Sequence, residues 1–231
     1  MIVEFLNQHE LGILRYLHIL AMVYWLGGEW GVFQTSYKVV DPALPVRERL
    51  RHLETVFRID VAARVGIVSL LPLGLHMGHL WGVQPWGGGF LWAVWLIWVL
   101  WVAVTLLAFR DKQRKTKSIF GTLEDWSRYI AIPLLIGAGG ASLMGMGPFS
   151  AESGQLWYSI KVLAFGVSMI IGLVLRHYLH EWPGIFARLL QGPDAAAEAR
   201  LADLIRSARI VAIIYWITIG VIGFFGAVKP F

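Results

Sequence analysis

Residues 15–31 have the sequence RYLHILAMVYWLGGEWG, an apolar run that contains a histidine and a glutamate. At ~100° per residue around an α-helix, one narrow stripe of this run holds Arg15, His18, Met22, Trp25 and Glu29. An ionisable side chain inside hydrocarbon costs roughly 2.5–3.5 kcal/mol, so the stripe is expected to face protein, a cofactor or water instead of lipid. We interpret the predicted helix as one wall of a buried site.

The composition of the whole chain indicates an integral membrane protein. Of the 231 residues, 57% are hydrophobic and only 15% are charged, which is more apolar surface than a soluble domain of this size can bury. The net charge of +5 comes from basic residues dispersed among the predicted loops, which favours the lipid bilayer over nucleic acid as a partner. Because the chain has no cysteine, disulfides, iron–sulfur clusters, thiolate-bound metals and covalently attached haem are excluded.

Six apolar segments are predicted to cross the membrane, within a single domain that covers residues 1–231. The segments lie at about 11–37, 61–82, 88–109, 129–147, 156–176 and 208–228. Lys and Arg gather in the loops after the first, third and fifth segments and are absent from the other two loops. By the positive-inside rule, the sequence predicts an all-α bundle of six transmembrane helices with both termini on the outer side of a bacterial-type inner membrane. A short cytoplasmic surface helix is expected at about 193–207.

Glycines within these segments predict close approach of helix backbones. The candidates are Gly27 and Gly31, Gly74 and Gly78, and the run Gly137, Gly139 and Gly140.

Three ionisable residues are predicted to share one level in the outer half of the membrane. At 1.5 Å per residue, His18 lies roughly 10 Å below the outer face, and His76 and Lys161 each lie ~8 Å below it. Two imidazoles on facing helices suit the axial positions of a b-type haem, with Arg15 and Lys161 as cations for its propionates. The same stripe adds Met22 and Trp25 to the predicted haem pocket.

Copper is the alternative metal. His76, Met77 and His79 end the second segment, and Met144 and Met146 end the fourth. Imidazole and thioether groups from two helices could therefore meet at the outer mouth, and thioether sulfur suits Cu(I).

Glu29 lies in the inner half of the first segment, at a depth similar to that of Arg64. Two interpretations are open. The carboxylate either pairs with Arg64 and pins two helices together, or it relays protons from the inner side toward the site.

Several short motifs resemble known families. Leu17-His18 followed by Trp25, Gly27 and Gly28 is similar to the first helix of the CopD copper-resistance family and of HemJ-type protoporphyrinogen oxidases. Trp157 followed by Lys161 resembles the later helix of that superfamily, and the ending from Val228 to Phe231 resembles the HemJ-type ending. The resemblance implies His18 as a haem ligand and Lys161 as its essential partner in porphyrin or electron chemistry. HemJ-type proteins have four helices, and the second and third segments of this chain form an additional hairpin.

These observations predict a membrane protein that binds haem b near the outer face and carries out electron transfer or redox chemistry, with quinone, a porphyrin or another redox protein as its partner. As an enzyme it would be a membrane oxidoreductase of HemJ type, with Lys161 and Glu29 as its catalytic residues. The alternatives are a CopD-like copper-handling or transport protein and an accessory scaffold subunit of a larger membrane complex.

Overall fold

The computed structural model describes residues 2–113, 119–152 and 154–230, and in these ranges the protein is all-α. It has six helices: α1 (Ile2–Val39), α2 (Val46–Leu80), α3 (Gly89–Gln113), α4 (Ile119–Leu143), α5 (Leu156–Leu189) and α6 (Ala195–Val228). Four stretches within them are long and apolar enough to cross a membrane, namely Gln8–Val39, Gly89–Lys112, Leu156–Leu189 and Ala195–Val228. The structure therefore supports a multi-pass membrane protein.

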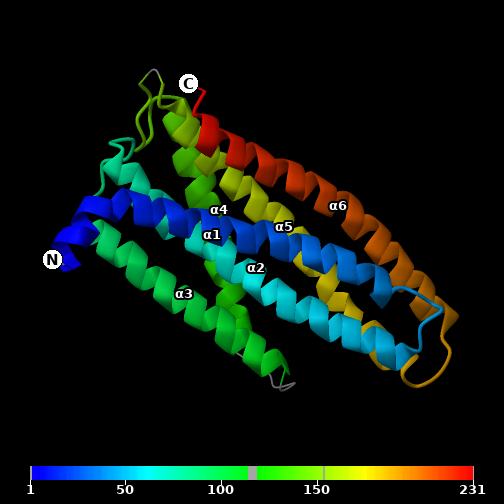
Figure 1. Ribbon diagram of the computed structural model, residues 1–231. Coiled ribbons are helices and arrows are strands. Elements are labelled where there is room, and N and C mark those ends of the chain that lie inside the picture. Colours follow the sequence, from blue (N-terminus) through cyan, green and yellow to red (C-terminus); the bar gives the residue numbers. More distant parts are fainter. Residues whose placement is uncertain (1, 114–118, 153, 231) are drawn as a thin grey trace.

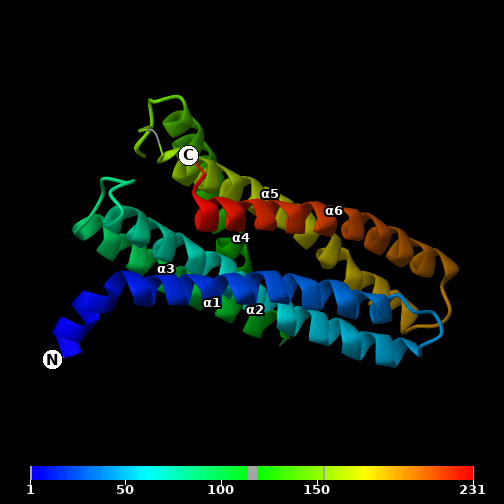
Figure 2. The same ribbon diagram turned by 45° about the horizontal axis from the view of Figure 1, so that its top comes forward.

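Four of the helices are much longer than a bilayer requires (Figure 1). α1, α2, α5 and α6 have 38, 35, 34 and 34 residues, whereas ~20 residues cross a hydrocarbon core of ~30 Å. In Figures 1 and 2 the α1–α2 and α5–α6 connections lie together at one end of the bundle, which we call the inner end. The opposite end is called the outer end.

The inner ends of the four long helices form a core of their own. Its members include Val56 of α2, Trp182 and Phe186 of α5, and Leu201 and Ile205 of α6, all almost fully buried. The expectation of a separate short helix at 193–207 is wrong, because residues 195–207 are the first part of the continuous helix α6. Packing against this core allows the helix to continue from the polar segment into the apolar one.

A buried ion pair ties α2 to α6 at this inner core. Arg49, only 1% exposed, holds both carboxylate oxygens of Glu198 at 2.7 and 2.9 Å. The same guanidinium donates to the carbonyl of Val39 at the end of α1. Arg49 therefore joins the three helices α1, α2 and α6.

Some glycines, though not all those predicted, bring helix backbones together. A Cβ atom added at Gly66 would lie 2.7 Å from the carbonyl oxygen of Ala21, so α2 lies directly on α1 there. Gly139 has the same relation to α5, since an added Cβ would lie 2.7 Å from the backbone nitrogen of Leu163. The prediction is wrong for Gly27, whose Cβ position meets nothing within 4 Å.

Of the other candidates, Gly31, Gly74 and Gly78 have atoms of another helix within 4 Å of an added Cβ, whereas Gly137 and Gly140 have none.

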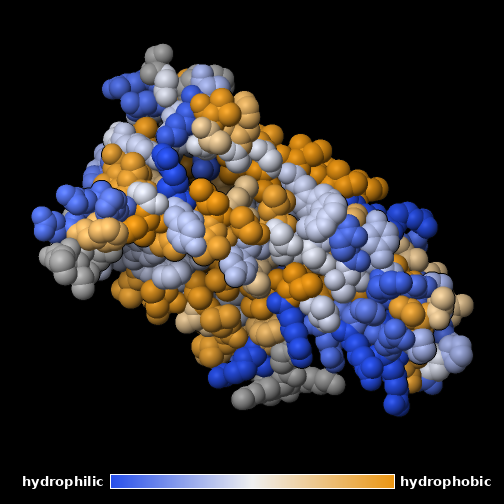
Figure 3. Space-filling model, in the orientation of Figure 1, coloured by the Kyte–Doolittle hydropathy of each residue, from blue (hydrophilic) through white to orange (hydrophobic). Residues whose placement is uncertain are grey.

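The surface agrees with a membrane setting, because apolar residues cover the middle of the face in Figure 3 and hydrophilic ones gather at the inner end.

Candidate functional site

The structure brings His18 of α1 and Lys161 of α5 together in the outer half of the bundle. Nε2 of His18 lies 3.4 Å from Nζ of Lys161, and both side chains are partly buried. Nδ1 of His18 is buried and has no hydrogen-bond partner. A buried imidazole nitrogen without a hydrogen-bond partner is unusual, and a ligand would supply the missing partner.

Glycines allow both side chains to lie close to neighbouring helix backbones. A Cβ atom at Gly74 of α2 would lie 3.7 Å from Cε1 of His18, and one at Gly226 of α6 would lie 2.6 Å from Nζ of Lys161. The pair therefore lies where α1, α2, α5 and α6 meet, next to two backbones that carry no side chain.

Cations flank this site at the outer end. Lys229 follows α6 directly, in a left-handed conformation with φ 49°, and its ammonium stands 3.6 Å from the ring centroid of Trp81 and 4.8 Å from that of Trp157. Burial lowers the pKa of Lys229, and the neighbouring Arg15 lowers that pKa further. Arg15 itself is exposed. The outer end thus presents Arg15, Lys161 and Lys229 around one histidine, which favours an anionic group.

The polar stripe of α1 continues from His18 toward the inner end, where its residues belong to the packed core. Trp25 is fully buried and donates from Nε1 to the hydroxyl of Tyr215 on α6, at 3.0 Å. Met22, one turn nearer the outer end, lies beside Gly223, where an added Cβ would be 3.6 Å from its Cε atom. These two residues connect the His18 level to the middle of the bundle.

His76 has other partners. Its Nδ1 accepts from Nε1 of Trp95 at 3.3 Å, and its Nε2 lies 3.2 Å from Oε1 of Glu10. Within the described part of the chain, no hydrogen bond or ring contact joins His76 to His18. Both ring nitrogens of His76 therefore face partners other than His18, and the pair of axial ligands that the sequence predicts stays a prediction.

The residues of the predicted copper site also differ in burial. Met77 is 3% exposed within the main core, whereas Met144 and Met146 are 67% and 75% exposed. The ring of His79 packs against Gly87, and its Nδ1 is buried without a partner. Across residues 2–113, 119–152 and 154–230, no group of three or more His, Asp and Glu side chains has the geometry to hold a metal ion.

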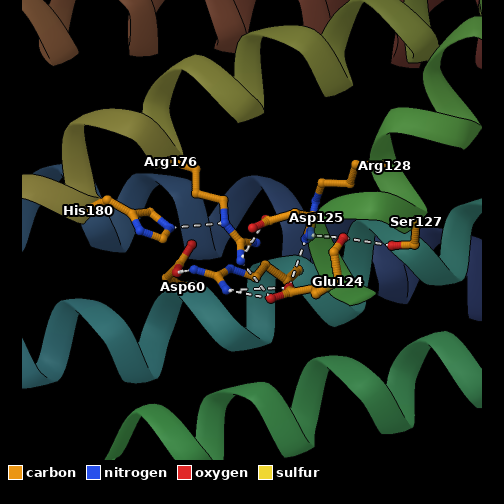
Figure 4. Close-up of polar contacts among 8 residues, drawn as sticks. Asp60, Glu124, Asp125, Ser127, Arg128, Arg176 and His180 are labelled. Atoms are coloured by element: carbon orange, nitrogen blue, oxygen red, sulfur yellow. Dashed lines mark hydrogen bonds and ion pairs between the residues drawn. The ribbon is translucent and has the colours of Figure 1, made fainter. Parts of the chain in front are cut away.

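A second polar centre, which the sequence analysis missed, lies in the inner half of the bundle (Figure 4). Glu124 of α4 is 1% exposed and accepts from Arg128 at 3.0 Å and from Arg176 of α5 at 2.8 Å. Nη1 of Arg64 on α2 lies 3.4 Å from the same carboxylate. Glu124 therefore compensates charge on three helices at once.

Further ion pairs surround Glu124. Arg64 also pairs with Asp60, and Arg176 pairs with Asp125 at 3.1 Å. The sequence indicates only the pairing of Glu124 with Arg128, because these residues are spaced i, i+4 at the start of the fourth apolar segment. The two other arginines that contact Glu124 come from α2 and α5, so the sequence alone does not show that they meet.

Glu29 lines a cavity of about 60 Å³ beside this centre. Its wall also includes Asp60, Arg64, Arg176 and Tyr215. The predicted ion pair between Glu29 and Arg64 is wrong, because Arg64 pairs with Asp60 and Glu124 instead. Among the described residues Glu29 has no hydrogen-bond or ion-pair partner, and the cavity is large enough for water.

Comparisons with protein-family models, with curated proteins and with solved structures give no match to this chain.

Proposed function

We propose that this protein is an integral membrane b-type haem protein that carries out electron transfer or redox chemistry near the outer leaflet. The observation that carries the proposal is the pairing of His18 with Lys161, two residues that depth alone placed at one level. Imidazole is a common axial ligand of haem iron, and anionic propionates need cations.

The residues around His18 fit such a group. The imidazole has one nitrogen without a partner, and Arg15, Lys161 and Lys229 supply positive charge. His18 would hold the iron and the three cations would face the propionates. When bound, the haem would supply one-electron transfer. Lys161 would hold positive charge beside the axial imidazole, and the apolar core around Trp25 would exclude water from it.

The proposed topology has six transmembrane helices and both termini on the outer side of the membrane. It is supported by the basic residues on the helix ends that flank the α1–α2 and α5–α6 connections, among them Lys38, Arg47 and Arg188, since the two connections lie at the same end of the bundle. The positive-inside rule assigns that end to the inner side. The His18 site then faces the outer half and the Glu124 centre the inner half.

The absorption spectrum of the purified protein, with haem extraction and metal analysis, tests the proposal. We expect a reducible Soret band that His18→Ala abolishes and that His76→Ala retains, because Trp95 and Glu10 already occupy the nitrogens of His76. Bound copper without porphyrin would instead support a CopD-like copper-handling protein. A protein that binds neither group would support the scaffold role.

A further inference from the structure

An apolar groove runs along the lipid-facing side of the α1–α2–α3 helices. Its volume is about 490 Å³. The wall includes Leu17 and Tyr24 of α1, Ala62 and Leu73 of α2, and Trp95 of α3. From Val61 to Leu73 the α2 wall extends ~18 Å along the helix. Leu17, Leu20 and Tyr24 are exposed, so the groove opens toward lipid.

The groove wall offers almost no free polar group. Trp98 donates its indole N–H to the hydroxyl of Ser69 at 3.0 Å, and Ser69 donates to the carbonyl of Val65. The polar groups of Ser69, Trp95 and Trp98 are thus engaged, and Tyr24 is the remaining polar residue of the wall. The groove suits a long hydrocarbon chain.

A polar pair stands at the outer end of the groove. Leu17, Leu73 and Trp95 line that end, and His76 follows Leu73 by one helical turn. Trp95 belongs to the groove wall and also donates to Nδ1 of His76. Because an indole N–H can only donate, Nδ1 is the acceptor and Nε2 carries the hydrogen of the neutral ring. That N–H lies 3.2 Å from Oε1 of Glu10.

We propose that the groove and the His76–Glu10 pair form a binding site for a lipid-soluble quinone. The isoprenoid tail lies in the groove, and the ring lies at the outer end. There Nε2–H of His76 exchanges its contact with Glu10 for a quinone carbonyl, and the freed carboxylate of Glu10 accepts from a hydroxyl of the reduced quinol.

The charge of Glu10, which pairs with His76 next to the groove, favours a quinone over an anionic phospholipid. The side chain of Glu10 is 43% exposed at this end, so its carboxylate repels a phosphate group. A quinone ring is uncharged, its carbonyls accept hydrogen bonds, and the hydroxyls of the reduced quinol can also donate them. His76 supplies a donor for the quinone and Glu10 an acceptor for the quinol.

This inference rests on the proposed redox function, for which it names the partner class. The binding itself is measured without haem, by photolabelling of the full chain in lipid nanodiscs. Two azido-quinone probes with isoprenoid tails are used, one a benzoquinone and one a naphthoquinone. Labelled peptides are located by mass spectrometry.

We expect labelling in α1, α2 and α3 around the groove, with excess unlabelled quinone competing and excess phosphatidylglycerol not competing. The more strongly labelling ring identifies the quinone class. Ala62→Phe fills the groove and His76→Gln removes the imidazole, and each should lower labelling roughly tenfold. Two matched controls, Ile213→Phe on the exposed face of α6 and His9→Gln beside Glu10, should leave labelling unchanged.

Unchanged labelling in both Ala62→Phe and His76→Gln overturns the site, as does equal competition by phosphatidylglycerol. Haem content is measured on the same samples. Haem-free protein that still labels in the groove rejects the proposed haem function and keeps the quinone site. Haem-loaded protein whose labelling is spread over the lipid-facing surface rejects the quinone site alone.

Discussion

His18 and Lys161 lie 143 positions apart in the chain, and yet Nε2 of the one is 3.4 Å from Nζ of the other. The other ring nitrogen of His18, Nδ1, is buried and has no hydrogen-bond partner. Leaving a buried polar group unpaired costs about 1–3 kcal/mol, which the rest of the bundle has to offset.

Replacing Lys161 by Met keeps the length of the side chain and removes its charge. In the haem-loaded protein we expect the haem to be retained and its reduction potential to fall by roughly tens of millivolts, because no cation then offsets the electron arriving at iron. Potentiometric titration measures the change, and Lys161→Arg is the control that keeps the charge. Loss of haem from Lys161→Met alone would make Lys161 a ligand.

Glu124 and Asp125 are adjacent acidic residues that pair with different numbers of arginines. Glu124→Gln leaves Arg128 without an acidic partner among the described residues and removes one of the two partners of Arg64 and of Arg176, so we expect a loss of about 3–5 kcal/mol in stability. Asp125→Asn, at a side chain that is 36% exposed, should cost at most about 1 kcal/mol. Thermal unfolding in detergent compares the two. Equal midpoints would show that Glu124 is not the centre of the cluster.

Two glycines allow a test of helix packing. An added methyl at Gly66 meets backbone atoms of α1, so Gly66→Ala should cost about 1–3 kcal/mol. Gly27→Ala meets nothing within 4 Å and should be neutral or stabilising by up to about 1 kcal/mol. The measurement is again the thermal midpoint. A Gly66→Ala variant as stable as the wild type would mean that α1 and α2 are farther apart.

Asp194 caps α6 and gives a pH-dependent contribution. The backbone N–H of Ala197 and the guanidinium of Arg188 hold the pKa of Asp194 below its ordinary value. A lowered carboxyl pKa means that the stabilisation is present at neutral pH and is lost as the pH falls through that lowered pKa. Asp194→Ala should therefore lower the unfolding midpoint at neutral pH, and the difference from wild type should shrink in acid. A difference independent of pH would contradict this.

The topology can be tested with single cysteines, because the chain has none of its own. In intact cells, an impermeant maleimide should label Glu152→Cys in the α4–α5 connection and should leave Ala43→Cys in the α1–α2 connection unlabelled. Lys115, which the basic loop places inside, lies outside the described residues, and its amine should be reached only after permeabilisation. The reverse pattern would exchange the two ends of the bundle.

The sequence by itself determined that this is a membrane protein and which residues share the polar face of α1. Hydrophobic composition and segment length predicted a membrane protein with apolar helices, since a bilayer imposes both. Helical periodicity placed His18 and Glu29 on one face of α1 because it depends only on spacing within one helix. Common depth also brought His18 and Lys161 to one level, though it left their rotation about the helix axes open.

Only the tertiary structure decided which faces meet. His76 was at the right depth for a second haem ligand, but rotation of α2 directs its ring to Trp95 and Glu10. The polar segment at 193–207 continues into α6 because the inner core packs against it. Glu124 became a centre of charge through arginines on α2 and α5, which are distant in the chain. Such partners depend on how helices pack, and local periodicity carries no information about that packing.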